Sequence, residues 1–139
     1  MIELTPFKDG HTYKFGFKNS AGKIVIAPVY DNCFKFSDGY AACCFGGDWG
    51  FINEYGQTVI PFKYFSVGSF NYGLAAVRIN DLWGYINKQG KVVIKPRFCM
   101  VNNFCYQRMM GLYAEVNIAK GREIKQYVIN EKGKIIEGE

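Results

Sequence analysis

Cysteine is the residue type in this sequence with the widest chemistry, because its thiolate is a nucleophile, a metal ligand and a redox partner. The chain of 139 residues contains five cysteines, namely Cys33, Cys43, Cys44, Cys99 and Cys105. They form no Cys-x-x-Cys motif and no Cys/His spacing typical of zinc sites, so we predict no bound metal. An odd number of cysteines in a chain of this size suits a reducing cytosol better than a disulfide framework.

The single histidine, His11, is the other candidate for acid–base chemistry. It follows Asp9 closely, but no serine or cysteine stands in a recognised nucleophile motif, and a catalytic triad needs all three groups. The sequence also has no P-loop, no dinucleotide-binding glycine fingerprint and no HExxH motif. We therefore expect a protein that is not an enzyme and has no cofactor, with His11 in a surface or turn-capping role.

Most of the chain, including the segments that carry Cys33, Cys43 and Cys44, repeats every 34 residues. The clearest columns are Phe15, Trp49 and Trp83; Gly16, Gly50 and Gly84; Asn19, Asn53 and Asn87; and Phe36, Phe70 and Phe104. A fixed period of this length marks a repeat architecture, in which each copy buries one face against the next. We infer that these columns hold the fold. The aromatic residues pack in the core, the glycines let an indole approach neighbouring backbone, and the asparagines cap their own turns.

Within one copy, residues 49–53 and 57–60 are predicted to form two strands joined by an Asn-x-x-Gly turn. Pro61 is expected to end the second strand, because it has no N–H to donate to the ladder. Residues 73–78 form a third strand, and a closing hairpin begins at Gln126. No segment has the apolar periodicity of a helix.

The predicted fold is therefore all-β. It consists of about 3.5 tandem three-stranded antiparallel meanders of 34 residues, forming a curled sheet or barrel-like body with almost no helix. One domain is expected over residues 1–139, with repeats at about 13–46, 47–80 and 81–122 and a partial copy at 123–139.

Two cysteines fall in columns that hold valine in other copies. Cys33 aligns with Val67 and Val101, and Cys43 aligns with Val77. Both are predicted to act as small buried hydrophobes.

The other three cysteines are not predicted to be buried in the core. Cys44 aligns with Arg78, on the opposite face of its strand from Cys43, and is expected to be more exposed. Cys99 and Cys105 have no repeat counterpart, so they are the candidates for a reactive thiol.

The repeated series Trp-Gly-Phe/Tyr-Ile-Asn, then Gly, then Val-Ile-(x)-Pro, then Gly-Leu-Ala-x-Val resembles the WG-repeat (KWG) β-repeat family, found mainly in bacteria. The matching segments are residues 49–77 and 83–96, with residues 15–43 as a degenerate first copy. The resemblance implies an interaction or scaffold module with no shared catalytic residue.

In such a repeat protein, positions that break the pattern are the best candidates for function. About four residues are added within residues 105–110, and residues 117–125 form a longer and more basic hairpin than the previous copy has. Aromatic, methionine and arginine side chains of this kind are enriched at interfaces. The candidate partner-binding residues are Tyr106, Gln107, Arg108, Met109, Met110, Lys120, Arg122 and Lys125.

Charge is unevenly distributed along the chain. Residues 1–77 carry six basic and six acidic side chains, whereas residues 78–139 carry eleven and six, so the net charge of +5 lies in the second part. Any electrostatic partner is expected to face that part.

The favoured function is a non-enzymatic protein-binding module, in its narrowest form a small cytosolic bacterial immunity protein or antitoxin that neutralises a partner toxin. The alternative is nucleic-acid or other polyanion binding through the basic second part. No run of about 18 apolar residues is present for a membrane span, and Met1 to Asp9 has no secretion-signal pattern. We therefore expect a cytoplasmic protein with no membrane partner.

Overall fold

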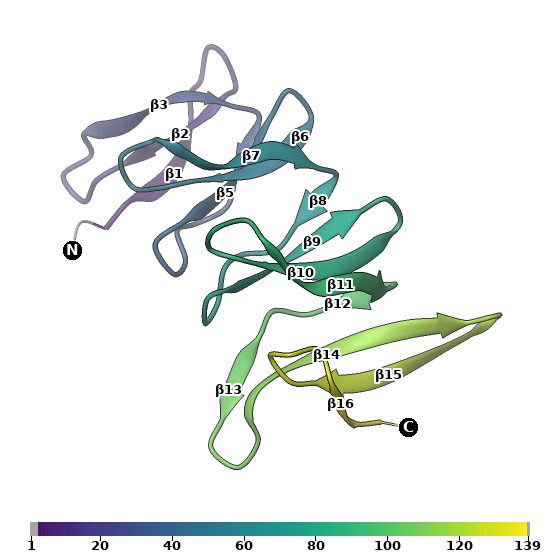
Figure 1. Ribbon diagram of the computed structural model, residues 1–139. Coiled ribbons are helices and arrows are strands. Elements are labelled where there is room, and N and C mark those ends of the chain that lie inside the picture. The colour runs from purple at the N-terminus through teal and green to yellow at the C-terminus, as the bar shows by residue number, and fades with distance from the viewer. Residues whose placement is uncertain (1–2, 139) are drawn as a thin grey trace. The chain divides into compact units, whose positions relative to one another are not determined.

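The computed structural model describes residues 3–138, which contain strands and turns but no helix (Figure 1). Strand pairing within the described residues is antiparallel, as the alternating pattern predicts. The all-β prediction is therefore confirmed. Because no helix occurs in this part of the chain, none is available there to cross a membrane.

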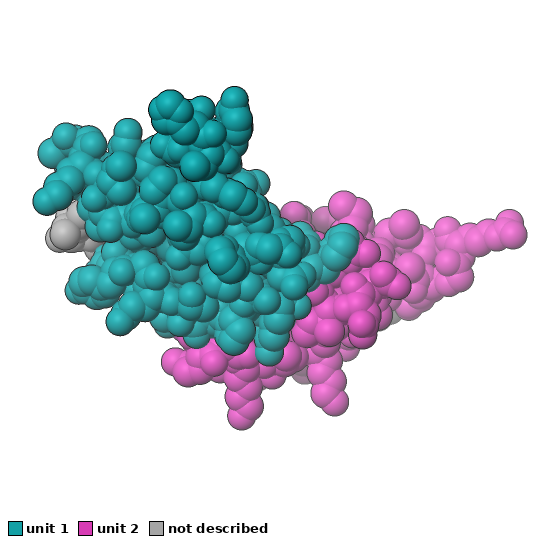
Figure 2. All heavy atoms as spheres, turned by 90° about the horizontal axis from the view of Figure 1, so that it is seen from above, with its two compact units in different colours: residues 1–69 teal, residues 70–139 magenta. Residues whose placement is uncertain are grey.

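The chain divides into two compact units, Met1–Ser69 and Phe70–Glu139, which Figure 2 shows in different colours. Unit 1 contains β1 (Thr5–Lys8), β2 (Phe15–Lys18), β3 (Ile24–Tyr30), β4 (Asn32–Cys33), β5 (Ala41–Phe45), β6 (Asp48–Ile52), β7 (Thr58–Tyr64) and β8 (Ser66–Val67). Unit 2 contains β9 (Leu74–Ile79), β10 (Leu82–Asn87), β11 (Val92–Phe98), β12 (Met100–Val101), β13 (Cys105–Gln107), β14 (Gly111–Lys120), β15 (Glu123–Ile129) and β16 (Ile135–Glu137). That the whole chain forms one domain stays a prediction.

The sheets are offset from the sequence repeat. Unit 1 holds one sheet in the order β1-β2-β3 and a second in the order β4-β5-β6-β7. In the second sheet, β5 closes one sequence copy and pairs with β6, which opens the next copy. In unit 2, β9 pairs with β10 and β14 pairs with β15 in the same way. The third strand of each copy, which is β5, β9 or β14, therefore pairs with the first strand of the next copy.

Proline does not end the second strand of the repeat, so that prediction was wrong. Strand β7 continues through Pro61 to Tyr64. Trp49 in β6 is paired with Tyr64, and Phe51 with Ile60, so the segment of β7 around Pro61 bulges opposite Gly50. An edge-strand bulge tolerates proline because its missing N–H is not needed by the ladder.

The bulge explains the glycine of the repeat. A Cβ atom on Gly50 would lie 2.6 Å from the carbonyl oxygen of Ile60 and 2.8 Å from the carbonyl carbon of Pro61. On Gly84 it would lie 2.5 Å from the carbonyl oxygen of Ile94. The glycine is therefore needed because the backbone of the opposing bulge lies too close for a Cβ atom. The prediction that the glycine makes room for an indole was wrong.

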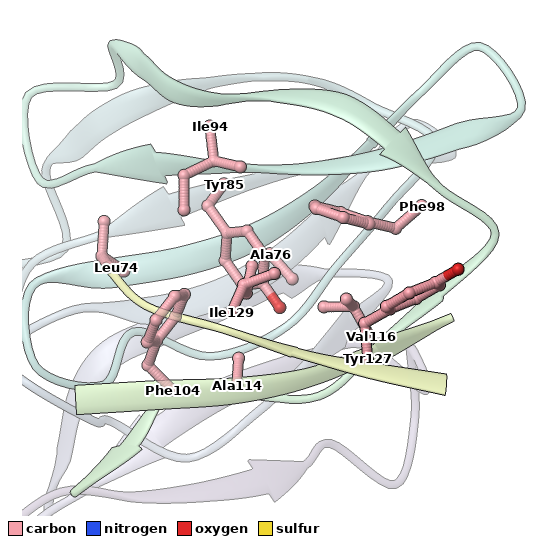
Figure 3. Packing of buried hydrophobic residues seen from close by; sticks show 10 residues of the cluster. All are labelled: Leu74, Ala76, Tyr85, Ile94, Phe98, Phe104, Ala114, Val116, Tyr127 and Ile129. Atoms are coloured by element: carbon pink, nitrogen blue, oxygen red, sulfur yellow. The ribbon is translucent and has the colours of Figure 1, made fainter. Parts of the chain in front are cut away.

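One hydrophobic core cluster, rich in aromatic rings, lies in unit 2 (Figure 3). Its buried members are Leu74, Ala76, Tyr85, Ile94, Phe98, Phe104, Ala114, Val116, Tyr127 and Ile129. The Tyr85 ring packs edge-on against the Phe104 ring, with centroids 4.8 Å apart, and its hydroxyl donates to the carbonyl oxygen of Asn102 at 2.7 Å. Trp83 is only partly buried and packs against this cluster. The residue two positions after the Trp column therefore fills the centre of the core, and the tryptophan covers its rim.

The asparagine column caps its turns as predicted. The Oδ1 atom of Asn53 accepts the backbone N–H groups of Tyr55 and Gln57, both at 3.0 Å. Asn130 makes the same pair of bonds to Lys132 and Lys134 in the partial fourth copy. These side chains are used in closing each hairpin.

Candidate interaction surface

The inserted segment of the third copy folds into an added hairpin. Strand β13 pairs with the beginning of β14, with Cys105 opposite Tyr113 and Gln107 opposite Gly111. The turn is closed by the N–H of Met110, which donates to the carbonyl oxygen of Gln107 at 3.1 Å. The insertion is thus an ordered part of the sheet.

The candidate residues of this hairpin are mostly exposed. Tyr106 is 58% exposed and Met109 is 95% exposed. Gln107 and Arg108 are also exposed, whereas Met110 is half-buried. The tip therefore presents one aromatic ring, one guanidinium and one thioether to solvent.

A second exposed aromatic, Tyr72, lies beside this hairpin, and the sequence analysis missed it. Its ring centroid is 6.5 Å from that of Tyr106, and it is 58% exposed. Its φ angle is +53°, in the left-handed region that bulky residues avoid. The first copy has Asp38 at the same column with φ +56°, and aspartate tolerates this conformation far better. The signal available in the sequence was a tyrosine directly before Gly73, at the column where the first copy has the turn-forming pair Asp38-Gly39.

We name the exposed group formed by Tyr72, Tyr106, Arg108 and Met109 the aromatic patch. The Tyr72 ring is exposed, and its positive φ belongs to a turn that the first copy also has at Asp38 and Gly39. The patch therefore combines interface-type side chains with a tyrosine at a turn position that the first copy fills with aspartate.

The second group of candidate residues lies at the tip of the β14–β15 hairpin. Gly121 and Arg122 form its two-residue turn, with Lys120 opposite Glu123 and Ile118 opposite Lys125. Gly121 has φ +64°, the positive angle that a type II′ turn requires at its first central position. Lys120, Arg122 and Lys125 are all exposed. We name these three residues the basic tip.

The structure does not bring the two groups of candidates together. Strand β14 carries the aromatic patch at Gly111 and the basic tip at Lys120, and Figure 1 shows the two hairpins leaving it in different directions. Ten residues of extended strand span about 30 Å. The candidate residues therefore form two separate surfaces of unit 2.

A third feature of unit 2 is a surface groove of about 430 Å³ beside β11. It is lined by Val93, Ile94, Lys95, Pro96, Arg97, Lys132 and Gly133. The Arg97 guanidinium donates to the carbonyl oxygen of Gly133, which ties β11 to the turn before β16. The lining contains three cationic side chains and no carboxylate. We name this feature the basic groove; none of its residues was among the candidates from sequence.

The cysteines are distributed differently from the prediction in one respect. Cys33 and Cys43 are buried, as expected, with their Sγ atoms 2.8 Å apart. Cys44 is also buried, at 9% exposure, although a more exposed position was predicted. The reason is that Asn32 and Trp49 lie directly opposite it on the two neighbouring strands. Burial raises the pKa of the Cys44 thiol.

The two candidate reactive cysteines lie in unit 2. Cys105 is exposed, and Cys99 is half-buried with its Sγ atom 3.3 Å from the carbonyl oxygen of Asn117. Whether either thiol is reactive stays a prediction.

The region of His11 is a turn stabilised by Asp9. The Asp9 carboxylate accepts the backbone N–H of Thr12 at 2.8 Å and that of His11 at 3.2 Å. These bonds, led by the one from Thr12, lower the pKa of the Asp9 carboxyl. The Asp9 carboxylate therefore closes this turn by accepting the backbone N–H groups of Thr12 and His11. Among residues 3–138, no group of three His, Cys, Asp or Glu side chains is placed to hold a metal ion.

The chain matches the family model described as WG containing repeat over residues 15–47, 49–83 and 83–106. The last match ends inside β13, so the turn of the inserted hairpin and the β14–β15 hairpin lie beyond the matched segments. No curated protein and no solved structure matches the chain. Because the matched segments cover more than half of its length, the chain belongs to the family of proteins built from WG-containing repeats.

Proposed function

We propose that this protein is a non-enzymatic protein-binding module and that its partner-binding surface is the aromatic patch of unit 2. The observation that carries the proposal is the exposed pair of Tyr72 and Tyr106, with centroids 6.5 Å apart, next to Arg108 and the almost fully exposed Met109. Tyrosine, arginine and methionine are the side chains enriched at the centres of protein interfaces.

The patch leaves apolar surface exposed to water. Tyr72 holds a positive φ at an exposed position, and Met109 exposes nearly its whole side chain. A bound partner that covers the two rings and the thioether removes apolar surface from water, which favours association.

The charge of unit 2 indicates the chemistry of the partner. Residues 70–139 carry eleven basic and six acidic side chains, whereas residues 1–69 carry six of each. The net positive charge of unit 2, to which Arg108 of the patch contributes, accelerates the approach of an acidic protein and disfavours a basic one. We therefore propose an acidic protein partner in the cytoplasm; neutralisation of a toxin is the narrower form of this proposal.

The basic groove supports a second candidate function, the binding of a single-stranded nucleic acid or another polyanion. Lys95, Arg97 and Lys132 line it without a compensating carboxylate. Such binding depends steeply on salt, because each neutralised phosphate releases counterions. Its surface is the groove and not the aromatic patch, so variants separate the two functions.

The test begins with capture of partners on the tagged full chain from native lysate, followed by affinity measurements with the identified, purified partner. We expect the double variant Tyr106→Ala/Arg108→Glu to weaken binding at least tenfold, because both side chains are exposed interface types. Tyr55→Ala is the matched control, since Tyr55 is a 79% exposed tyrosine of unit 1.

Two results count against the proposal. One is equal loss of affinity in the Tyr55 control, and the other is unchanged affinity in the double variant. If labelled single-stranded RNA binds at low salt and the triple variant Lys95→Glu/Arg97→Glu/Lys132→Glu abolishes that binding while no acidic partner binds, the second function replaces the first.

A further inference from the structure

Two cysteines of unit 1 face each other across a pair of antiparallel strands. Cys33 in β4 lies directly opposite Cys43 in β5. The N–H of Phe34 donates to the carbonyl oxygen of Ala42, and that of Asp31 to the carbonyl oxygen of Cys44, both at 2.8 Å. Because hydrogen-bonded and non-hydrogen-bonded pairs alternate along an antiparallel ladder, the cysteine pair between them is of the non-hydrogen-bonded type. Pairs of this type bring their Cα atoms closest, to about 4.5 Å, and their side chains are in contact.

The two sulfur atoms are correspondingly close. The Sγ–Sγ distance is 2.8 Å, and a disulfide bond is about 2.05 Å long. Cα separations of about 4.4 to 6.8 Å are compatible with a disulfide, so the strands need little movement to form one. The bond requires mainly a change in the side-chain torsions.

The repeat supplies an internal comparison for this pair. At the equivalent place in unit 2, β12 and β14 put Val101 opposite Val116, with the N–H of Asn102 bonded to the carbonyl oxygen of Glu115. A cysteine at one of these columns is explained as a small hydrophobe. Cysteines at both members of one contacting pair create a possible covalent bond as well.

We propose that Cys33 and Cys43 are a redox pair that closes to a disulfide when a peroxide oxidant reaches unit 1. In the first step, the sulfur of one cysteine attacks a peroxide oxygen; the O–O bond breaks, and a sulfenic acid and one water form. In the second step, the other thiol attacks that sulfur; the S–O bond breaks, the S–S bond forms and a second water leaves. The two thiols lose two electrons and two protons in all, and one hydrogen peroxide is reduced to two waters.

The surroundings assign the order of attack. Cys43 has no exposed surface, and the hydrogen bond with Cys33, together with burial, raises the pKa of its thiol. Cys33 retains 7% exposure as a residue, so we expect peroxide to reach its side chain before that of Cys43. Because both groups are shielded, the reaction is slower than that of a thiol in solvent. A dithiol reductant reverses it by thiol–disulfide exchange.

Closing the bond has a consequence for stability. Cys33 and Cys43 are ten residues apart, and a loop of that length lowers the unfolding equilibrium constant about 100-fold in the chain-entropy description. The effect belongs to unit 1, which contains both cysteines. Oxidation is therefore expected to stabilise the β4–β7 sheet, which holds both cysteines.

The first experiment locates the bond. The folded full chain is treated with hydrogen peroxide, the oxidant is removed, remaining thiols are blocked with N-ethylmaleimide in denaturing urea, and the unreduced protein is digested for mass spectrometry. Trypsin cleaves after Lys35, so a cross-linked peptide pair reports a bond from Cys33, and fragmentation of the peptide that holds both Cys43 and Cys44 identifies which of the two is bonded. We expect Cys33 joined to Cys43, with Cys44 alkylated. Alkylation of both Cys33 and Cys43 under conditions that oxidise Cys105, or a bond from Cys33 to Cys44, overturns the proposal.

The second experiment uses a variant that the molecule itself suggests. Cys33→Val/Cys43→Val reproduces the valine pair of unit 2 and is expected to fold like the parent. The background variant Trp83→Phe leaves Trp49 as the fluorophore of unit 1. Peroxide should raise the urea midpoint of unit 1 in the parent, dithiothreitol should restore it, and the valine variant should not respond. A peroxide-induced increase that persists in the valine variant overturns the assignment.

Discussion

The two units are built from the same parts but depart from the common pattern in different places. Both use Asn-capped hairpins, a proline-containing bulge opposite glycine and a buried aromatic core. Unit 1 is electrically neutral, and its distinctive feature, the Cys33–Cys43 contact, is buried. Unit 2 carries the whole excess of positive charge, and its distinctive features are exposed hairpins.

The comparison indicates that, in this repeat protein, residues shared by all copies hold the fold, whereas features found in one unit are candidates for function. A column that every copy retains is explained by what every copy must do, which is to turn, bulge and pack. Features present in one unit alone are free of that requirement. If this is so, equivalent substitutions at shared columns should destabilise the two units equally, and substitutions at a feature of one unit should change the stability of that unit alone.

The largest expected effect concerns the shared glycine of the bulge. Gly50→Ala in unit 1 and Gly84→Ala in unit 2 each place a methyl group within 2.6 Å of opposing backbone. We expect each to destabilise its unit by about 3 kcal/mol, because backbone on both strands must move. Urea unfolding of single-tryptophan variants measures this, with Trp49 reporting unit 1 and Trp83 reporting unit 2.

Gly10→Ala is the matched control for the bulge glycines. A Cβ atom at Gly10 meets nothing within 4 Å, and we expect its effect to stay within about 0.5 kcal/mol. A loss at only one of Gly50 and Gly84 would show that the two bulges are not equivalent.

The second largest effect is expected at alkaline pH, where the two units should lose stability at different pH values. Charging a buried group costs more free energy than losing one neutral hydrogen bond. In unit 2, burial raises the pKa of Tyr85 above its ordinary value of 10.0. In unit 1, the hydrogen bond with Cys33 and burial raise the pKa of Cys43, and burial raises that of Cys44, above 9.0. The unfolded state loses these protons first, so stability is complete below the ordinary pKa and falls as pH rises above it.

Unit 1 is therefore expected to begin losing stability near pH 9, and unit 2 nearer pH 10. Urea midpoints of the two single-tryptophan variants across this range measure the onset. Simultaneous loss, or earlier loss in unit 2, contradicts the assignment.

A smaller effect is expected at the one repeat column where unit 1 has a buried phenylalanine and unit 2 has a buried tyrosine. The column that holds Phe51 in unit 1 holds Tyr85 in unit 2, whose hydroxyl donates to Asn102 at 2.7 Å. Tyr85→Phe should cost about 1 kcal/mol through loss of this bond. It should also weaken the alkaline destabilisation of unit 2 and leave that of unit 1 unchanged. An unaltered pH profile in the variant would assign that destabilisation to another group.

The smallest effect is expected at surface ion pairs. In unit 1, Lys14 bonds to Asp31, with side chains 44% and 35% exposed, and this bond lowers the pKa of Asp31. Its contribution is present above the ordinary pKa of 3.8 and is lost as pH falls through the lower folded value. We expect Lys14→Met to cost at most about 0.5 kcal/mol because solvent screens the pair.

The pair in unit 2, Arg78 with the 95% exposed Asp81, is the comparison for Lys14 and Asp31. Its removal by Asp81→Asn should have no measurable effect on the urea midpoint. A larger loss in unit 2 than in unit 1 would reverse this ranking of the two pairs.

Much of the fold could be predicted because repetition converts one local pattern into many observations. The Asn turns, the buried Phe70 and Phe104, and the closing hairpin after Gln126 all follow from short-range preferences seen several times in the sequence. The continuation of β7 through Pro61 could not be predicted, because it depends on the bulge facing Gly50 across the sheet. The burial of Cys44 likewise depends on neighbours contributed by two other strands.

The candidate surface was predicted only in part. The sequence located the insertion that holds Tyr106 and Arg108, because an added segment is visible in the spacing of the repeat. It did not associate Tyr72 with that insertion or Lys132 with Arg97, since both pairs are distant in the chain and adjacent only after folding.

The sequence by itself determined that this is an all-β repeat protein, which columns hold the fold and where the positive charge lies. These properties depend on composition, period and local turn chemistry, which need no knowledge of distant contacts. Tertiary structure alone decided that the insertion and the basic hairpin lie at opposite ends of β14, and that Cys33 and Cys43 meet. Strand pairing joins residues across the sheet, so register and not spacing determines which side chains share a site.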